Sequence, residues 1–201
     1  LANEFLRPER LWGGEVGAEW DRDGTKLSIT VFLNRLENAI ANVTIGPNLS
    51  QRQNLDAIDS KGVEVSAEQA IGPAVLRATW AYTDARVDAS GAAAALDGRR
   101  PAQIARHGAS LSLRDNGGGP FGGFATLRYI GAQNEDDLGL QRLGDALTLD
   151  AGLSWRLSGV IGIEARGENL FDEPVPAAIS SSGIVERATP RTLWIGTRIN
   201  F

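Results

Sequence analysis

Apolar and polar residues alternate without a break along residues 147–157. Leucine, alanine and tryptophan occupy the odd positions, and threonine, aspartate, glycine, serine and arginine occupy the even ones. A two-residue period is that of a β-strand with two different faces, whereas an amphipathic helix needs apolar residues three and four positions apart. The segment is therefore expected to be a strand that lies between an apolar and a polar environment.

The same alternation recurs along the chain and predicts nine strands and no convincing helix. The strands are expected near residues 15–20, 25–34, 63–68, 76–83, 109–114, 124–129, 147–157, 161–166 and 190–201. Tight turns at 21–24, 71–73, 115–119 and 158–159 alternate with long connections at about 36–59, 86–102, 131–146 and 171–190. This alternation is typical of an outer-membrane β-barrel, which has short periplasmic turns and long external loops.

Strand length and composition are compatible with a barrel. An eleven-residue strand spans roughly 36 Å, or about 25 Å when it is tilted near 45°, which is the height of the apolar band. The sequence has 24 glycines and 42% hydrophobic residues, and it lacks the long apolar run of a transmembrane helix. Because cysteine is absent, disulfides and thiolate chemistry are excluded. A net charge of −5 without a basic stripe argues against nucleic acid as a partner.

An odd number of strands has a consequence for closure. The first and last strands of a nine-stranded meander run in the same direction, whereas single-chain bacterial barrels close with an even number. The sequence also begins without methionine or a charged and apolar leader. We therefore expect a segment of a longer protein, with two open sheet edges that further strands would cover.

Several short motifs occur in an order that resembles a known family. They are Ser60-Lys61-Gly62-Val63-Glu64-Val65, Trp80-Ala81-Tyr82-Thr83-Asp84-Ala85-Arg86, Gly98-Arg99-Arg100-Pro101, Glu168-Asn169-Leu170-Phe171-Asp172, and a last strand that runs from Pro190 to Phe201. Together they resemble the C-terminal part of a TonB-dependent outer-membrane receptor.

The resemblance implies an all-β fold and a transport function. Residues 1–201 would form an antiparallel up-and-down meander of about nine strands, the C-terminal segment of a larger, 22-stranded transmembrane β-barrel without its plug domain and N-terminal strands. The protein would take up a scarce nutrient, most often a ferric siderophore, across the bacterial outer membrane. Its partners would be that small-molecule ligand, membrane lipid, and the TonB complex through the missing N-terminal region. No enzymatic activity, cofactor or resident metal is implied.

The candidate ligand-binding residues are three arginines in the expected external loops. Arg99, Arg100 and Arg187 carry guanidinium groups that could bind an anionic ligand such as a ferric siderophore. Contact with lipopolysaccharide phosphates, or simple solvation, would explain them equally well. The acidic loop Glu135-Asp136-Asp137 could hold Ca²⁺, but it lacks the spaced ligands and glycine of a recognisable calcium loop, so a solvated acidic loop is the preferred interpretation.

Charged residues on the polar faces of the strands form a second group. Their alternation predicts a ladder along a lumen or against a plug, with a substrate track as the less favoured alternative; its members are Glu64, Glu68, Arg77, Arg128, Asp150, Arg156, Glu164, Arg166 and Arg198. His107, the single histidine, is expected to be a ring at the membrane boundary and not a ligand.

Two other functions fit parts of the pattern. An outer-membrane barrel enzyme would need a catalytic pair, which His107 alone hardly supplies. A soluble β-sandwich used for binding would bury the alternate residues against a second sheet. If the barrel interpretation is correct, the isolated chain exposes apolar rows and open edges, and it should self-associate.

Overall fold

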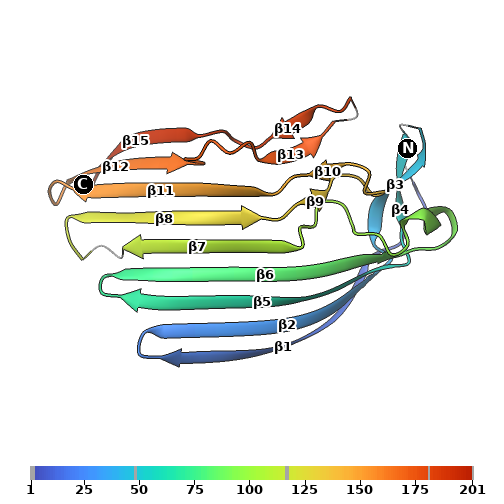
Figure 1. Ribbon diagram of the computed structural model, residues 1–201, viewed down its shortest axis with the longest axis horizontal. Helices are drawn as coiled ribbons and strands as arrows, with labels where there is room; N and C mark the ends of the chain where they lie inside the picture. The colour runs from blue at the N-terminus through green and yellow to red at the C-terminus, as the bar shows by residue number, and fades with distance from the viewer. Residues whose placement is uncertain (1–2, 48, 116–117, 181, 201) are drawn as a thin grey trace.

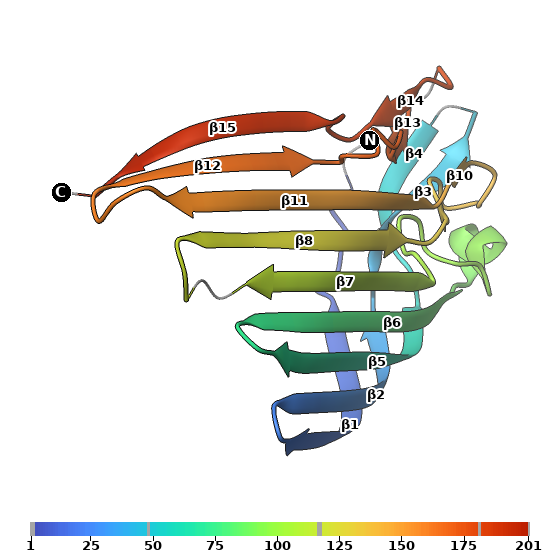
Figure 2. The ribbon, with the colours of Figure 1, turned by 60° about the vertical axis from the view of Figure 1, so that its left-hand side comes forward.

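The computed structural model describes residues 3–47, 49–115, 118–180 and 182–200. Its main element is a nine-stranded sheet in which each strand pairs antiparallel with the next one in space (Figures 1 and 2). In spatial order the strands are β1 (Arg10–Arg22), β2 (Thr25–Glu37), β5 (Ala57–Ile71), β6 (Ala74–Asp88), β7 (His107–Asp115), β8 (Phe121–Ile130), β11 (Ala146–Arg156), β12 (Ile161–Glu168) and β15 (Thr192–Ile199). The predicted nine-stranded meander is confirmed.

The strand register sorts the side chains into one apolar and one polar face. Val31 lies opposite both Val16 and Val63, whereas its neighbour Thr30 lies opposite Gly17 and Glu64. Since residues directly opposite each other share a face, both patterns continue across the sheet. The apolar face includes Trp20, Leu27, Ile29, Leu33, Val65, Leu76, Trp80, Leu111, Leu113, Leu127, Leu149, Leu153, Ile163 and Ile195.

The apolar face is exposed. Ile195 is 84% exposed, Leu153 73% and Leu33 64%, although each is a large hydrophobic side chain. The only sheets besides the main one, within the described residues, are three two-stranded ribbons. The core that a soluble β-sandwich would form between two large sheets is therefore not seen in the described part of the chain.

The long connections gather at one end of the sheet, opposite the short turns and the C-terminus (Figures 1 and 2). They hold short elements that the sequence pattern did not predict. These are the hairpin of β3 (Ile40–Gly46) and β4 (Leu49–Asn54), the 3₁₀ helix η1 (Gly91–Leu96), the pair β9 (Gln133–Asn134) and β10 (Arg142–Leu143), and the pair β13 (Pro176–Ile179) and β14 (Val185–Arg187).

The buried hydrophobic core lies where these connections meet the sheet. Val43 of β3, Leu55, Val87 of β6 and Leu96 of η1 are each at most 6% exposed and form one cluster with Ala39, Ala89 and Ala93. Leu138, from the connection that carries β9 and β10, packs against it. Three connections that are distant in sequence therefore share one core, and they form a packed structure above the end of the sheet.

Among the described residues, no helix has the length and apolar character needed to cross a membrane.

Candidate ligand-facing wall and connections

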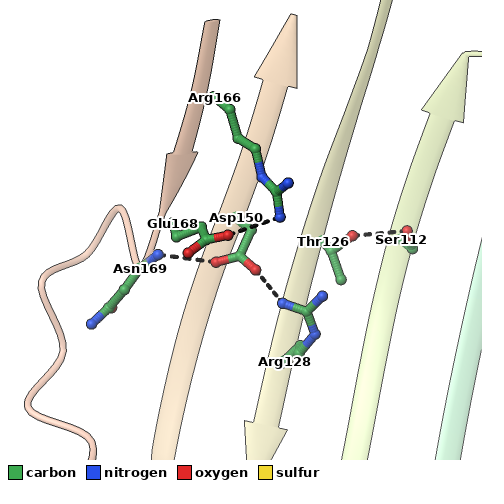
Figure 3. Close-up of polar contacts among 7 residues, drawn as sticks. All are labelled: Ser112, Thr126, Arg128, Asp150, Arg166, Glu168 and Asn169. Carbon is green, nitrogen blue, oxygen red and sulfur yellow. Dashed lines mark hydrogen bonds and ion pairs between the residues drawn. The ribbon is translucent and has the colours of Figure 1, made fainter. Parts of the chain in front are cut away.

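Hydroxyl groups pair across the strands on the polar face. Ser28 and Ser66 lie 2.8 Å apart between their oxygens. The corresponding distances are 2.7 Å for Thr79 and Ser110, and 2.9 Å for Ser112 and Thr126 (Figure 3). Each pair joins neighbouring strands, so these polar groups satisfy one another while keeping a lone pair or proton for water or a ligand.

Most of the charged side chains on this face are paired with opposite charges. Arg198 lies 2.6 Å from Glu164, and Arg166 lies 2.8 Å from Glu168. The pairs Arg77–Glu68 and Arg128–Asp150 are also in contact. The predicted charge ladder is present, but its charges largely neutralise one another. The wall can therefore hydrate strongly without carrying one sign of charge.

A hollow of about 560 Å³ opens on the polar face. Its lining combines the hydroxyl pairs Ser28–Ser66 and Thr79–Ser110 with Glu64, Arg128 and Thr148, and Val175 from the connection after β12 contributes an apolar side chain. A surface of this kind offers many weak hydrogen-bonding groups and few fixed charges. It suits contact with water or with a polar protein segment more than capture of one small anion.

Aromatic rings on the polar face lie over glycines of the neighbouring strand. Phe32 lies opposite Gly62, and Phe124 lies opposite Gly152. A Cβ atom at Gly152 would be 2.5 Å from the Phe124 ring, and one at Gly62 would be 2.5 Å from the Phe32 ring. The glycines therefore make room for rings that would otherwise project into the polar space.

The segment after β12 forms a corner built around Asn169. Its backbone N–H donates to Oδ1 of Asp150 at 2.9 Å (Figure 3). Its side-chain amide accepts from the N–H of Glu173 at 3.0 Å and donates to the carbonyl of Glu173 at 2.9 Å. Asn169 is 5% exposed and has a φ of 47°. Asp172 continues the corner by accepting from the N–H of Arg191 at 3.1 Å. The motif that suggested the family is thus a structural corner.

Arg99, the first candidate ligand residue, stabilises the connections. Its Nε donates to the carbonyl of Ala95 at 2.7 Å, and its Nη1 donates to the carbonyl of Leu138 at 2.7 Å. These bonds join the connection that carries η1 to the one that carries β9 and β10. The guanidinium is engaged by the protein itself in this structure.

Arg100 and Arg187 lie in different surroundings. Arg100 is half-buried and contacts Asp84 at 3.2 Å, and Asp84 shares the apolar face of β6 with Tyr82 and Trp80. Arg187 is exposed at the end of β14. The structure therefore does not bring the three candidate arginines together at one site, and their role in ligand binding stays a prediction.

A second hollow, of about 590 Å³, lies between the connections. Asn42, Ser50 and Gln103 line it together with the acidic loop Glu135-Asp136-Asp137. The acidic loop was singled out from the sequence, but Asn42, Ser50 and Gln103 were not, because the short elements within the connections show too little periodicity to reveal which side chains converge.

The acidic loop uses its carboxylates to hold its own backbone. Asp136 accepts from the N–H groups of Leu140 and Gln141, and Asp137 accepts from the N–H and hydroxyl of Thr44 in β3. The described residues contain no group of three or more side chains placed to hold a metal ion. Loop organisation is the role that the geometry supports for these carboxylates.

His107 lies on the apolar face near the connections. Its ring centroid is 5.9 Å from that of Trp80 and 5.2 Å from that of Tyr82. The three rings form an aromatic group on the apolar face. The charged residue Asp84 lies on the same face of β6, two residues beyond Tyr82. A boundary between apolar and polar surroundings is where such amphipathic rings are commonly placed.

Comparison with known proteins assigns the family. The model of the TonB dependent receptor-like β-barrel matches residues 1–170, and the chain therefore belongs to this family of outer-membrane receptors. A comparison with curated proteins gives no match.

Solved structures share the fold. The ferric yersiniabactin uptake receptor FyuA from Yersinia pestis is 21% identical, with a TM-score of 0.79, over 96% of this chain and 30% of its own. The copper transporter OprC is 16% identical, with a TM-score of 0.76, over 98% and 32%. The pyoverdine receptor FpvA from Pseudomonas aeruginosa PAO1 is 15% identical, with a TM-score of 0.73, over 100% and 31%. This chain spans about a third of the length of these receptors.

Proposed function

We propose that this chain forms the C-terminal nine strands of the barrel of a TonB-dependent receptor in the bacterial outer membrane. The receptor imports a scarce nutrient, and a ferric siderophore is the ligand class that we favour. The observation that carries the proposal is the two-faced sheet, whose exposed apolar face suits lipid and whose paired polar face suits a hydrated lumen. The family match supports the same reading.

The arrangement of the connections gives the sheet a direction in the membrane. Outer-membrane barrels place long loops outside the cell and short turns in the periplasm. The packed connections around Val43, Leu96 and Leu138 would therefore face the medium, and the hollow between them would be the first part of this chain that a ligand meets. In this proposal Arg187 contacts the ligand directly, while Arg99 and Arg100 shape the connections around it.

Energy for uptake would come from outside this chain. A plug domain inside the barrel and a segment that engages TonB would couple the receptor to the inner membrane, and the polar wall around Ser66 and Arg128 would face the plug. Transport by this route requires no covalent chemistry from the described residues. A barrel enzyme is the weaker alternative, because His107 packs against two aromatic rings on the lipid side.

Uptake of labelled iron tests the proposal. The complete receptor gene would be expressed in cells that lack their own siderophore receptors, and ⁵⁵Fe uptake would be measured for a panel of ferric siderophores. We expect accumulation with at least one siderophore, and we expect it to be abolished when TonB is deleted. Accumulation that persists without TonB would contradict the energy coupling. Uptake of another nutrient class, with none for any siderophore, would replace the ligand but keep the receptor.

A further inference from the structure

A group of charged side chains interrupts the apolar face at the end that carries the long connections. The register places Lys61 opposite Leu33 on one side and Asp84 on the other, and it places Asp59 opposite Arg35 and Arg86. These residues therefore belong to the face that carries the exposed apolar rows. We call the group the rim patch; its members are Arg35, Asp59, Lys61, Asp84, Arg86, Asp88, Arg100 and Arg106.

Two carboxylate-centred clusters build the rim patch. Oδ1 of Asp84 lies 3.3 Å from Arg86, 3.2 Å from Arg100 and 3.5 Å from Arg106. Arg35 bridges Asp59 and Asp88, each at 2.6 Å. The carboxylate of Asp84 is largely covered, whereas the side chains of Arg86 and Arg106 remain 46% and 43% exposed. One anion holds three guanidinium groups in place. Nη1 of Arg86 also donates to the carbonyl of Gly98 at 3.1 Å, but the five N–H donors of each guanidinium exceed these contacts, so the exposed parts of Arg86 and Arg106 can make further bonds.

The rim patch is positive although the chain is negative. It contains five cationic and three anionic side chains, which leaves two positive charges in excess, while the whole sequence carries a net charge of −5. The three carboxylates of the patch offset only part of the positive charge, so a further anion placed beside the patch would be attracted to it. The excess is on the lipid-facing side, so the complementary anion would belong to the membrane.

A groove with apolar and charged walls begins directly beside these cations. Its volume is about 530 Å³, and its lining combines Trp12, Leu33 and Gly14 with the charged residues Arg35, Asp59, Lys61, Asp84 and Arg86. Gly14 lies opposite Leu33 on the apolar face, and a Cβ built on it would meet no atom within 4 Å. The missing side chain leaves a furrow next to Trp12. A charged rim and an apolar furrow together match a molecule that has an anionic head and a hydrocarbon chain.

We propose that the rim patch and this furrow bind a phosphorylated lipid of the surrounding leaflet. Guanidinium groups of Arg86 and Arg106 would bond phosphate oxygens of the head group, and an acyl chain would lie along Gly14 and Leu33. The aromatic group at Trp80 and His107 marks the depth at which head groups meet hydrocarbon. The inference depends on the barrel lying in the outer membrane and not on which nutrient the receptor imports.

Binding of a defined lipid to the purified receptor tests this inference. The complete receptor would be titrated in detergent with diphosphoryl lipid A, and bound lipid would be counted by native mass spectrometry. An arginine near an anionic membrane surface is worth about a factor of five in affinity, so Arg86→Gln with Arg106→Gln should weaken binding about 25-fold. The matched pair Arg114→Gln with Arg156→Gln removes the same charge from the polar face and should leave binding unchanged.

Two further comparisons separate the head group from the chain. Gly14→Leu fills the furrow without changing charge and should weaken binding about tenfold, whereas Ala18→Leu adds bulk on the same face farther along β1 and should have little effect. Monophosphoryl lipid A should bind the unmodified receptor about fivefold more weakly than the diphosphoryl form. That comparison needs no variant and remains decisive if a variant fails to fold.

Several results would overturn the inference. Equal affinity for the two lipid A forms would show that the site does not recognise the phosphate. An equal loss of lipid affinity in the two double arginine variants would show a general effect of charge. Inorganic phosphate that displaces the lipid at equal concentration would indicate a free-anion site. A complex of two receptors that disappears with Arg86→Gln and Arg106→Gln would assign the rim patch to a second copy of the protein instead.

Discussion

The backbone N–H of Asn169 donates to Oδ1 of Asp150 at 2.9 Å, from the residue that follows β12 to the middle of β11. The other carboxylate oxygen of Asp150 accepts a hydrogen bond from Nη1 of Arg128 in β8 (Figure 3). One side chain therefore joins two strands and the corner that leads to β13. The Asn169 side chain completes the corner by bonding both backbone groups of Glu173.

Replacing Asn169 by alanine should destabilise the sheet. The change leaves the part-buried N–H of Glu173 without its partner, whereas the carbonyl of Glu173 still accepts from the N–H of Val175; this loss costs about 1–3 kcal/mol. It also places alanine at a φ of 47°, which costs about 1–2 kcal/mol more. We expect the free energy of unfolding to fall by about 2–5 kcal/mol in total, measured by denaturant titration of the complete barrel in lipid vesicles.

Asn38→Ala is the matched control for backbone conformation. Asn38 also has a positive φ, of 54°, and begins the connection between β2 and β3. This variant should lose only the conformational cost of about 1–2 kcal/mol. If Asn38→Ala and Asn169→Ala were equally destabilising, the amide bonds of the corner would contribute nothing.

The two glycines beneath aromatic rings should respond differently to alanine. At Gly152 the near contacts of an added Cβ are with the Phe124 ring, whereas at Gly62 the Cβ would also be 2.2 Å from the carbonyl oxygen of Tyr82. Each substitution should cost about 1–3 kcal/mol or more. Adding Phe124→Ala should recover much of the loss at Gly152, because a side chain is the obstacle. Adding Phe32→Ala should recover little at Gly62, because backbone remains in the way.

Gly108→Ala supplies the control for this comparison. Gly108 lies on the same polar face, and a Cβ there would meet no atom within 4 Å. Its unfolding free energy should stay within about 0.5 kcal/mol of the unmodified protein. Full rescue of Gly62→Ala by Phe32→Ala would show that the Tyr82 carbonyl is not the obstacle.

The strands could be predicted because the polarity of each residue indicates which face of the sheet it occupies. In β11 the residues of the apolar face and of the polar face alternate without exception from Leu147 to Arg156, and each strand of the sheet shows enough of this period to be recognised alone. The pairing order followed from the turn lengths. Local sequence was sufficient here because a two-faced sheet needs no distant information to decide which side chain points where.

The connections could not be predicted because their structure depends on distant contacts. Val43, Leu96 and Leu138 are separated by more than forty residues from one another along the chain, yet they share one core. Arg99 looked like a free loop cation because nothing local reveals that it reaches the carbonyl of Leu138. Likewise, Arg100 was expected in an external loop, and only the fold shows that it contacts Asp84 on the apolar face.

Arg99 and Arg187 should separate loop structure from ligand contact. Arg99→Ala removes two hydrogen bonds to backbone carbonyls, so amide hydrogen exchange in residues 131–146 should accelerate about tenfold. Arg187→Ala should leave that exchange unchanged and weaken ligand binding by about a factor of ten. Arg99→Lys keeps the charge but cannot make both bonds. If it exchanged as slowly as the unmodified protein, the two carbonyl contacts would not hold the connections.

The polypeptide of residues 1–201 should self-associate when it is produced alone in water. Side chains such as Val16, Leu153 and Ile195 are more than 70% exposed, and the edge strands β1 and β15 pair on one side only within the described sheet. Large apolar patches and unpaired edges both favour association. Light scattering coupled to size exclusion should give a mass of several times 21.4 kDa without detergent. Replacing Leu27, Ile29, Val31 and Leu33 by serine should reduce this mass, whereas serine at Thr30 and Asn34 should not. A monodisperse monomer in plain buffer would show that the apolar face is covered within one chain.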